Sequence, residues 1–185
     1  FSGSKNEHLA TFEKVYGRRL HIYRVFKTES WPTITDEEKG FVTSGGIVFY
    51  SIQPKPWSDW AGSSKAQSIA KFAQAIKALA PAQVMVAPGF EPDGHAAESQ
   101  NHTNLVYGTA AEYKAMFSNF KEVFAAQGVT NAIFVLDLSC NLKAWPFVLE
   151  ELYAGNDAVD WLFFNLFQSH KQDGPKDGNC TQMAQ

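Results

Sequence analysis

Residues 84–95 read VMVAPGFEPDGH, and this stretch decides how the rest of the chain is interpreted. It opens with the apolar run VMVA and then breaks in a cluster of prolines and glycines. A carboxylate, Glu91, follows the point where a buried strand would end. Parallel α/β enzymes commonly build a site from an acid at the carboxyl end of a strand. The segment EPDG is also a favourable β-turn, so a plain turn remains open on the motif alone.

Length, charge and apolar runs indicate a single domain and argue against a nucleic-acid partner and a membrane span. The chain has 185 residues, of which 45% are hydrophobic and 14% aromatic, and its net charge is −3. This length suits one domain with a sizeable core. No basic run exceeds Arg18-Arg19, which argues against a nucleic-acid partner. No apolar run approaches the roughly 20 residues that a bilayer-spanning helix needs, so we expect no membrane span.

Helical and strand patterns alternate along the chain. Helical spacing of apolar residues, or a capped helical turn, is found at residues 6–16, 35–38, 63–79, 109–126 and 144–153. Runs rich in β-branched and aromatic residues predict strands at residues 20–26, 47–52, 83–87, 131–139 and 158–167. The segment after residue 52, which carries Trp57 and Trp60, is expected to be a loop, as are residues 88–108. We expect one domain over residues 1–170, followed by a loop or tail at 171–185.

The expected strands are nearly continuous apolar runs, which is typical of a parallel sheet buried on both faces. Strands of this kind with intervening helices leave two folds open. One is an open doubly wound sheet that is complete in 185 residues. The other is a (β/α) barrel, which usually needs about 250 residues.

Aromatic and polar side chains gather after the expected strands. Four tryptophans follow strands, namely Trp31, Trp57, Trp60 and Trp145, and polar groups such as Glu91, His95 and Cys140 do the same. The carboxyl ends of parallel strands share one face of the fold. Aromatic rings beside carboxylates and amides suit sugars, because sugar C–H faces stack on rings while hydroxyls form hydrogen bonds. Packing of loops onto the sheet is the alternative role for each tryptophan.

The sequence does not favour a nucleotide site, a metal site or a nucleophile elbow. No glycine-rich phosphate cradle follows the first strand, which argues against nucleotide cofactors. The five histidines lack the spacing of a metal site. Ser139-Cys140 follows a strand without the glycines of a nucleophile elbow. We therefore expect neither a metal nor a cofactor.

Cysteines and glycosylation sequons favour a secreted or cell-surface protein. The two cysteines are Cys140 and Cys180, and the two sequons begin at Asn101 and Asn179. We expect the cysteines to form a disulfide, worth about 3–4 kcal/mol in the loop-entropy model. Two reduced, buried thiols and unused sequons are the alternative.

The order of these motifs resembles glycoside hydrolase family 26, the β-mannanase-like (β/α)8 barrels. The segment VMVAPGFEPDG matches the family strand that carries the acid/base, with Glu91 at the acid position. Residues 48–54 (VFYSIQP), 131–138 (NAIFVLDL) and 153–162 (YAGNDAVDWL) match further segments, of which the last is the most specific. The resemblance covers most of residues 1–170 in the right order.

The resemblance implies an α/β fold of the (β/α)8 TIM-barrel type, with strands two to six of the eight in this chain. It implies a glycoside hydrolase that acts on or binds β-linked, mannan-type polysaccharide, by a retaining mechanism with Glu91 as acid/base. The family's nucleophile is a glutamate on a later strand, so we expect this chain to be a fragment. The expected substrate-binding residues are Trp31, Trp57, Trp60, His95, Trp145 and Asn165.

The chain departs from the family pattern near the acid. Phe90 stands where the family has histidine, Ala87 or Pro88 replaces the strand arginine, and the last strand ends in NLF at 165–167. Asp137 is the internal candidate for the nucleophile. These departures leave an alternative open: a catalytically inactive carbohydrate-binding or structural module of an extracellular glycoprotein assembly. A complete five-stranded flavodoxin-like binder is a third interpretation.

Overall fold

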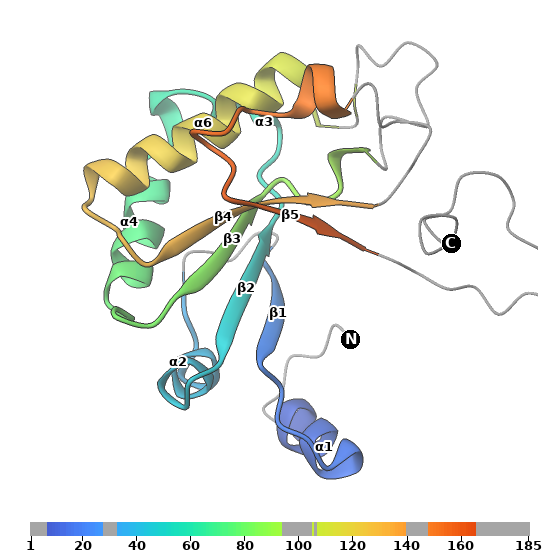
Figure 1. Ribbon diagram of the computed structural model, residues 1–185. Helices are drawn as coiled ribbons and strands as arrows, with labels where there is room; N and C mark the ends of the chain where they lie inside the picture. Colours follow the sequence, from blue (N-terminus) through green and yellow to red (C-terminus); the bar gives the residue numbers. More distant parts are fainter. Residues whose placement is uncertain (1–6, 28–32, 94–104, 106, 140–147, 166–185) are drawn as a thin grey trace, which may run out of the picture.

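The computed structural model describes residues 7–27, 33–93, 105, 107–139 and 148–165 of the chain. Within these residues, five strands form one parallel sheet in the order β1-β2-β3-β4-β5 (Figure 1). The strands are β1 (Ile22–Lys27), β2 (Ile47–Ile52), β3 (Val84–Pro88), β4 (Ala132–Leu138) and β5 (Trp161–Phe164). Each lies, to within one residue at its carboxyl end, in a segment for which the sequence predicts a strand, so these five predictions are confirmed.

Within the described residues, one helix precedes β1 and the others lie between successive strands. They are α1 (Glu7–Tyr16), α2 (Asp36–Thr43), α3 (Trp57–Trp60), the 3-10 helix η1 (Ser63–Lys65), α4 (Ala66–Lys77), α6 (Ala110–Ala126) and the π-helix η3 (Val148–Leu152). Helix α3 corrects the expectation of a loop after β2. Its first residue, Trp57, is only 1% exposed, so burial of the indole folds this segment against the core. Within the described residues, no helix is long and apolar enough to cross a bilayer.

Two helices begin with a capping box. Thr35 Oγ1 accepts from the backbone N–H of Glu38 at 3.2 Å, and the Glu38 carboxylate accepts from the Thr35 N–H at 3.1 Å. Thr109 and Glu112 repeat this pattern at α6, at 3.2 and 2.7 Å. These reciprocal bonds satisfy N–H groups that the first helical turn leaves unpaired, which is why each helix begins where it does.

The helix-facing side of the sheet carries the main core. Figure 1 shows α3, α4 and α6 along the same side of the strands. Alternate strand residues point to this side, namely Val48, Tyr50, Ile52, Val84, Val86, Phe134 and Leu136. They pack on the apolar stripes of α4 (Ile69, Phe72 and Ile76) and α6 (Phe117, Phe120 and Phe124). Phe41 of α2 and Trp57 of α3 join the same cluster.

The opposite side of the sheet, which we call the inner face, has a smaller cluster. It consists of Phe49, Met85, Ala87 and Val135, with Ile47, Ile133 and Phe163 packed against it. No described helix contributes to this cluster. A doubly wound sheet carries helices on both faces and reverses its strand order. The sequential order and the one-sided helices therefore identify an arc of a (β/α) barrel, with β1 and β5 as its edges in the described part.

Candidate active site at the carboxyl ends of the strands

A polar cluster interrupts the apolar inner face near the carboxyl ends of the strands. We call it the inner polar cluster; its members are Arg24, Ser51, Glu91, Asp137 and Asn165. The Arg24 guanidinium forms an ion pair with Asp137 and donates further hydrogen bonds to Ser51 Oγ, at 2.8 Å, and to Asn165 Oδ1. Ser51 and Asp137 each lie two residues after an inner-face apolar residue, which is why strand alternation brings them to this face.

Asp137 is the buried anchor of the inner polar cluster. It is 1% exposed, and its carboxylate accepts from Arg24, from Ser51 Oγ at 3.1 Å and from Asn165 Nδ2 at 2.8 Å. Desolvation raises the pKa of Asp137 to about 6, although the Arg24 charge and the hydrogen bond from Ser51 pull it down. With both oxygens engaged and no access to solvent, Asp137 lacks the open face that a nucleophile requires.

Asn165 connects this anchor to Glu91. Its Nδ2 donates to Glu91 Oε1 at 2.7 Å as well as to Asp137 Oδ1. An amide has one accepting and one donating end, and Arg24 donates to the accepting end. The guanidinium therefore fixes the orientation of the amide, whose NH2 group faces the two carboxylates. The structure thus brings Asn165, one of the predicted site residues, together with Glu91.

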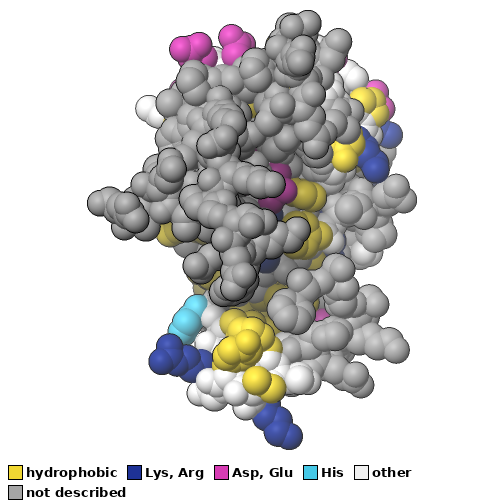
Figure 2. Space-filling view, turned by 90° about the vertical axis from the view of Figure 1, so that its right-hand side faces the viewer, with side chains coloured by type: hydrophobic (Ala, Val, Ile, Leu, Met, Phe, Trp, Pro, Cys, Tyr) yellow, Lys and Arg dark blue, Asp and Glu magenta, His cyan; other side chains and the backbone are white. Residues whose placement is uncertain are grey.

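A sharp turn at the end of β3 carries Glu91 out of the sheet. Gly89 has a φ of 72°, and a Cβ at this position would lie 2.8 Å from the Tyr113 ring. Glu91 has a φ of 53°, a strained conformation for a residue with a side chain, and its N–H donates to the Asp137 carbonyl at 2.7 Å. Its carboxylate is partly exposed. Figure 2, which views the molecule from the right-hand side of Figure 1, shows acidic and basic side chains among hydrophobic ones in the described part of the chain.

Asp93 ties the same turn to the neighbouring strand. It is 1% exposed and accepts from the backbone N–H of Ser139 at 2.7 Å and from Ser139 Oγ at 3.0 Å. These bonds join the segment after β3 to the end of β4. Asp93 therefore stabilises the turn that holds Glu91. A turn in the segment EPDG and a partly exposed acid at Glu91 thus occur together.

Two of the predicted sugar-binding tryptophans are described, Trp57 and Trp60, and both lie apart from this cluster. Trp57 packs edge-on against Tyr113, with ring centroids 5.0 Å apart, in the main core. Trp60 stacks on Phe120 of α6 at 6.1 Å. Neither ring is brought next to Glu91, so the prediction that they contact sugar gains no support. Several predicted residues lie outside the described part of the chain: Trp31, His95, Trp145, Asn101, Asn179, Cys140 and Cys180.

Sequence reasoning missed Arg24 and Ser51 as members of the site. Each interrupts a strand segment of otherwise apolar and aromatic residues, in IYRVF (22–26) and IVFYSI (47–52). A buried polar residue requires hydrogen-bonding partners, so this interruption could have suggested an inner-face polar layer. Among the described residues, no group of three or more His, Cys, Asp or Glu side chains is arranged to hold a metal ion.

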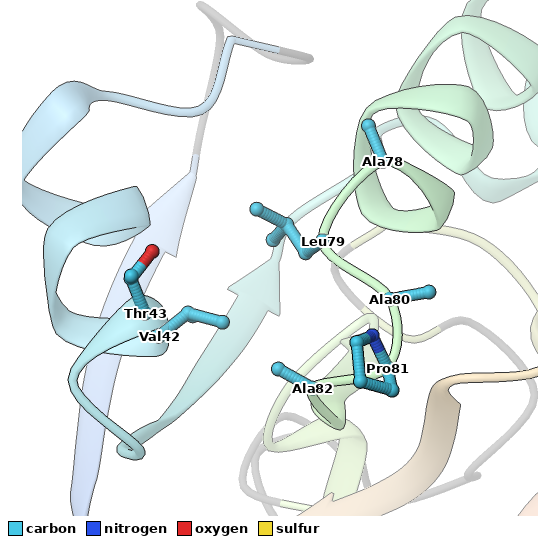
Figure 3. Close-up of a pocket in the computed structure, with 7 residues that line it drawn as sticks. All are labelled: Val42, Thr43, Ala78, Leu79, Ala80, Pro81 and Ala82. Atoms are coloured by element: carbon cyan, nitrogen blue, oxygen red, sulfur yellow. The ribbon is translucent and has the colours of Figure 1, made fainter.

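A pocket of about 470 Å³ lies near the amino ends of the strands, away from Glu91 (Figure 3). It is lined by Val42 and Thr43 at the end of α2 and by residues 78–82, which precede β3. The lining contains no titratable side chain. Because barrel enzymes place their chemistry at the carboxyl ends of the strands, this pocket is not the candidate active site.

Comparison with solved structures identifies the type of barrel. The chain matches the glycoside hydrolase family 26 (GH26) domain of an endo-β-mannanase/endo-β-glucanase from Prevotella bryantii, with a TM-score of 0.67 and 13% identity. The match covers 89% of this chain and 65% of that domain. The catalytic domain of a GH26 endo-β-1,4-mannanase from a Bacillus species matches over 72% of this chain and 40% of that one, with a TM-score of 0.47 and 18% identity.

The first match shows that the described sheet and helices have a GH26-like, TIM-barrel-like fold. The chain spans 65% of the length of the Prevotella domain. No protein-family model and no curated protein matches the chain. The resemblance inferred from the sequence is thus confirmed at the level of the fold.

Proposed function

We propose that this chain carries the acid/base half of a retaining glycoside hydrolase that cleaves β-linked, mannan-type polysaccharide. The observation that supports this most directly is the placement of Glu91. It is a partly exposed carboxylate at the carboxyl end of β3, oriented by Asn165, in a domain with a GH26-like fold. The activity of the structural neighbours suggests the substrate class.

In the proposed reaction, Glu91 donates its proton to the glycosidic oxygen while a second carboxylate, about 5–5.5 Å away, attacks the anomeric carbon. The leaving sugar departs with that proton, and a glycosyl-enzyme ester remains. Glu91 then takes a proton from water, which attacks the ester and releases the second sugar. Because Asp137 is buried and fully bonded, we assign the nucleophile to a carboxylate outside the described residues.

Asn165 has a positioning role in this proposal. Its NH2 group donates to Oε1 of Glu91, so that oxygen acts as an acceptor. The proton to be transferred is therefore carried on Oε2. Arg24 supports this arrangement indirectly, because it fixes the amide of Asn165.

The replacement Glu91→Gln tests the assignment. It keeps the shape and the hydrogen bond from Asn165 but removes the transferable proton, so cleavage of β-1,4-mannan should fall about 10²–10⁴-fold. Release of reducing ends measures the rate. The matched control, Glu150→Gln, changes an exposed acid in η3 and should leave turnover unchanged. Turnover by the Glu91→Gln variant at the rate of the unaltered protein would remove Glu91 from the mechanism.

A binding module without catalysis is the second candidate. It is favoured by the full engagement of Asp137 and by Phe90 in place of the histidine that precedes the acid in the family. In that case the unaltered protein binds β-mannan without releasing reducing ends, and Glu91→Gln binds equally well. Both candidates are proposed to act outside the cell or at its surface, on the basis of the sequons and cysteines, and the second also within an assembly of extracellular chains.

A further inference from the structure

An aromatic pair lies directly beside Glu91. Phe26 is two residues beyond Arg24 on β1, so it lies on the inner face one layer nearer the carboxyl end of the strand. Phe90 immediately precedes Glu91. The two rings meet edge to face, with centroids 5.2 Å apart and planes at 77°. Phe26 is 45% exposed and Phe90 is partly exposed, so the pair offers an apolar surface next to the carboxylate.

The inner polar cluster also contacts this aromatic pair, through Arg24 and the Phe26 ring. The Arg24 guanidinium carbon lies 4.5 Å from the centre of the Phe26 ring, and Asp137 and Ser51 fix that guanidinium. A cation over a ring face is an attractive contact that restrains the ring. The two rings come from β1 and from the end of β3, the neighbours of β2, so they span the end of β2. One set of side chains therefore orients both the acid and the aromatic surface.

This surface suits a pyranose ring. A sugar presents a C–H face that can lie on an aromatic ring, while its hydroxyl and glycosidic oxygens remain at the edge within reach of a neighbouring carboxylate. A purely apolar partner would take Oε2 of Glu91 out of water without offering it a hydrogen bond, which is costly. The combination of exposed rings and an adjacent, oriented acid therefore selects a carbohydrate over an apolar ligand.

We propose that Phe26 and Phe90 form the surface on which a sugar ring of the bound β-linked chain stacks beside Glu91. This inference rests on the proposed function for its substrate class. It assigns to two phenylalanines the role that the sequence suggested for tryptophans. Because phenylalanine has no polar tip, the surface contributes apolar contact, and hydrogen bonds to the sugar come from other groups.

Titration of β-1,4-linked mannohexaose into the Glu91→Gln protein by calorimetry tests this inference. Adding Phe26→Ala or Phe90→Ala to that background should weaken binding about tenfold, since either change removes a stacking ring. Phe26→Tyr keeps the ring and should bind as the parent does. The control Tyr16→Ala removes an exposed ring of α1 and should leave affinity unchanged.

A second measurement does not depend on the folding of the alanine variants. In the Glu91→Gln protein, nuclear Overhauser contacts should connect the ring protons of Phe26 and Phe90 with sugar C–H protons, and those to the Phe90 ring should be lost in Phe90→Leu. Binding that is unchanged in both alanine variants, or an absence of such contacts in a complex that does form, overturns the aromatic surface and leaves the proposed function standing. If the unaltered protein neither binds nor cleaves β-mannan, both proposals fall.

Discussion

Two basic residues of the same strand, Arg24 and Lys27, form largely buried ion pairs on opposite faces of the sheet. Lys27 reaches Glu38 at 2.7 Å on the helix-facing side, and Arg24 reaches Asp137 on the inner face. The Glu38 carboxylate also accepts from the Tyr50 hydroxyl, at 2.9 Å, and from the backbone of Thr35. It thereby joins β1, β2 and the start of α2.

The two pairs differ in where their hydrogen bonds lead. Those of the Lys27–Glu38 pair end at the fully buried Tyr50 hydroxyl and at the backbone of Thr33 and Thr35, and among the described residues they reach no second carboxylate. Those around Asp137 continue through Asn165 to Glu91, which is partly exposed. A buried ion pair is weak support for stability or function by itself. Here, only the pair whose hydrogen bonds reach an accessible carboxylate is a candidate for a functional role.

Replacement of each basic residue by methionine should separate the two roles. Arg24→Met and Lys27→Met each leave a buried carboxylate without its cation, so each should lower the free energy of unfolding by about 3–5 kcal/mol. Only Arg24→Met also releases the Asn165 amide, so only this variant should lose mannan cleavage. Urea unfolding and initial rates, measured where both variants remain folded, provide the check. Equal loss of activity in the two variants would contradict the distinction.

The pH dependence of stability should report the titration of Asp137. Because the pKa of Asp137 is about 6 in the folded protein and its ordinary value is 3.8, the folded state binds more protons between these values. Its contribution to stability is present below about pH 4 and is lost as pH rises through 6. This amounts to about 2–3 kcal/mol. Asp137→Asn cannot titrate, so the fall in unfolding free energy from pH 4 to 7 should shrink by that amount.

Glu38→Gln serves as the matched control for this experiment. It removes a carboxylate from the other ion pair and leaves Asp137 in place, so the part of the slope due to Asp137 should persist. Denaturant unfolding at constant ionic strength and several pH values measures both variants. A slope in Asp137→Asn that equals that of the unaltered protein would show that Asp137 does not titrate as inferred.

The smallest expected effects concern the helix caps. Thr35→Ala and Thr109→Ala each remove the hydroxyl that accepts from the third helical N–H, and each should lower the free energy of unfolding by about 1 kcal/mol. Both caps lie outside the inner polar cluster, so mannan cleavage by the folded protein should not change. A drop in activity in Thr35→Ala would indicate that the Lys27–Glu38 region communicates with the site.

Much of the fold follows from local sequence patterns. The apolar runs at residues 47–52 and 83–87 and the periodic stripe at 109–126 predict strands and a helix that the structure contains, because buried strands and amphipathic helices have strong repeating patterns. Helix α3 was missed because it spans only Trp57–Trp60 and depends on burial of a single indole. A helix this short has no periodicity to detect.

The site was only partly predictable for a related reason. Glu91 could be inferred because it follows an expected strand, and Asn165 because the family resemblance marks its position near the end of the last expected strand. Arg24 and Ser51 could not, since their partnership depends on the register of β1 on β2, where Phe26 pairs with Ser51, and on the distant Asp137. Trp57 illustrates the converse: its position after a strand does not reveal whether the ring turns inward or toward solvent.

The hydrogen bond that holds Gly89 against α6 limits which substitutions this domain can accept near the acid. The buried Tyr113 hydroxyl of α6 donates to the Gly89 carbonyl at 3.2 Å. Further along the chain, the Glu91 N–H donates to the Asp137 carbonyl of β4, and the Asp93 carboxylate accepts from the backbone N–H of Ser139. The acid is thus fastened to the scaffold on both sides before the chain enters the segment beyond Asp93. A change of sequence beyond Asp93 can therefore leave the acid in place, whereas a side chain at Gly89 would clash with the Tyr113 ring in a backbone conformation that favours glycine.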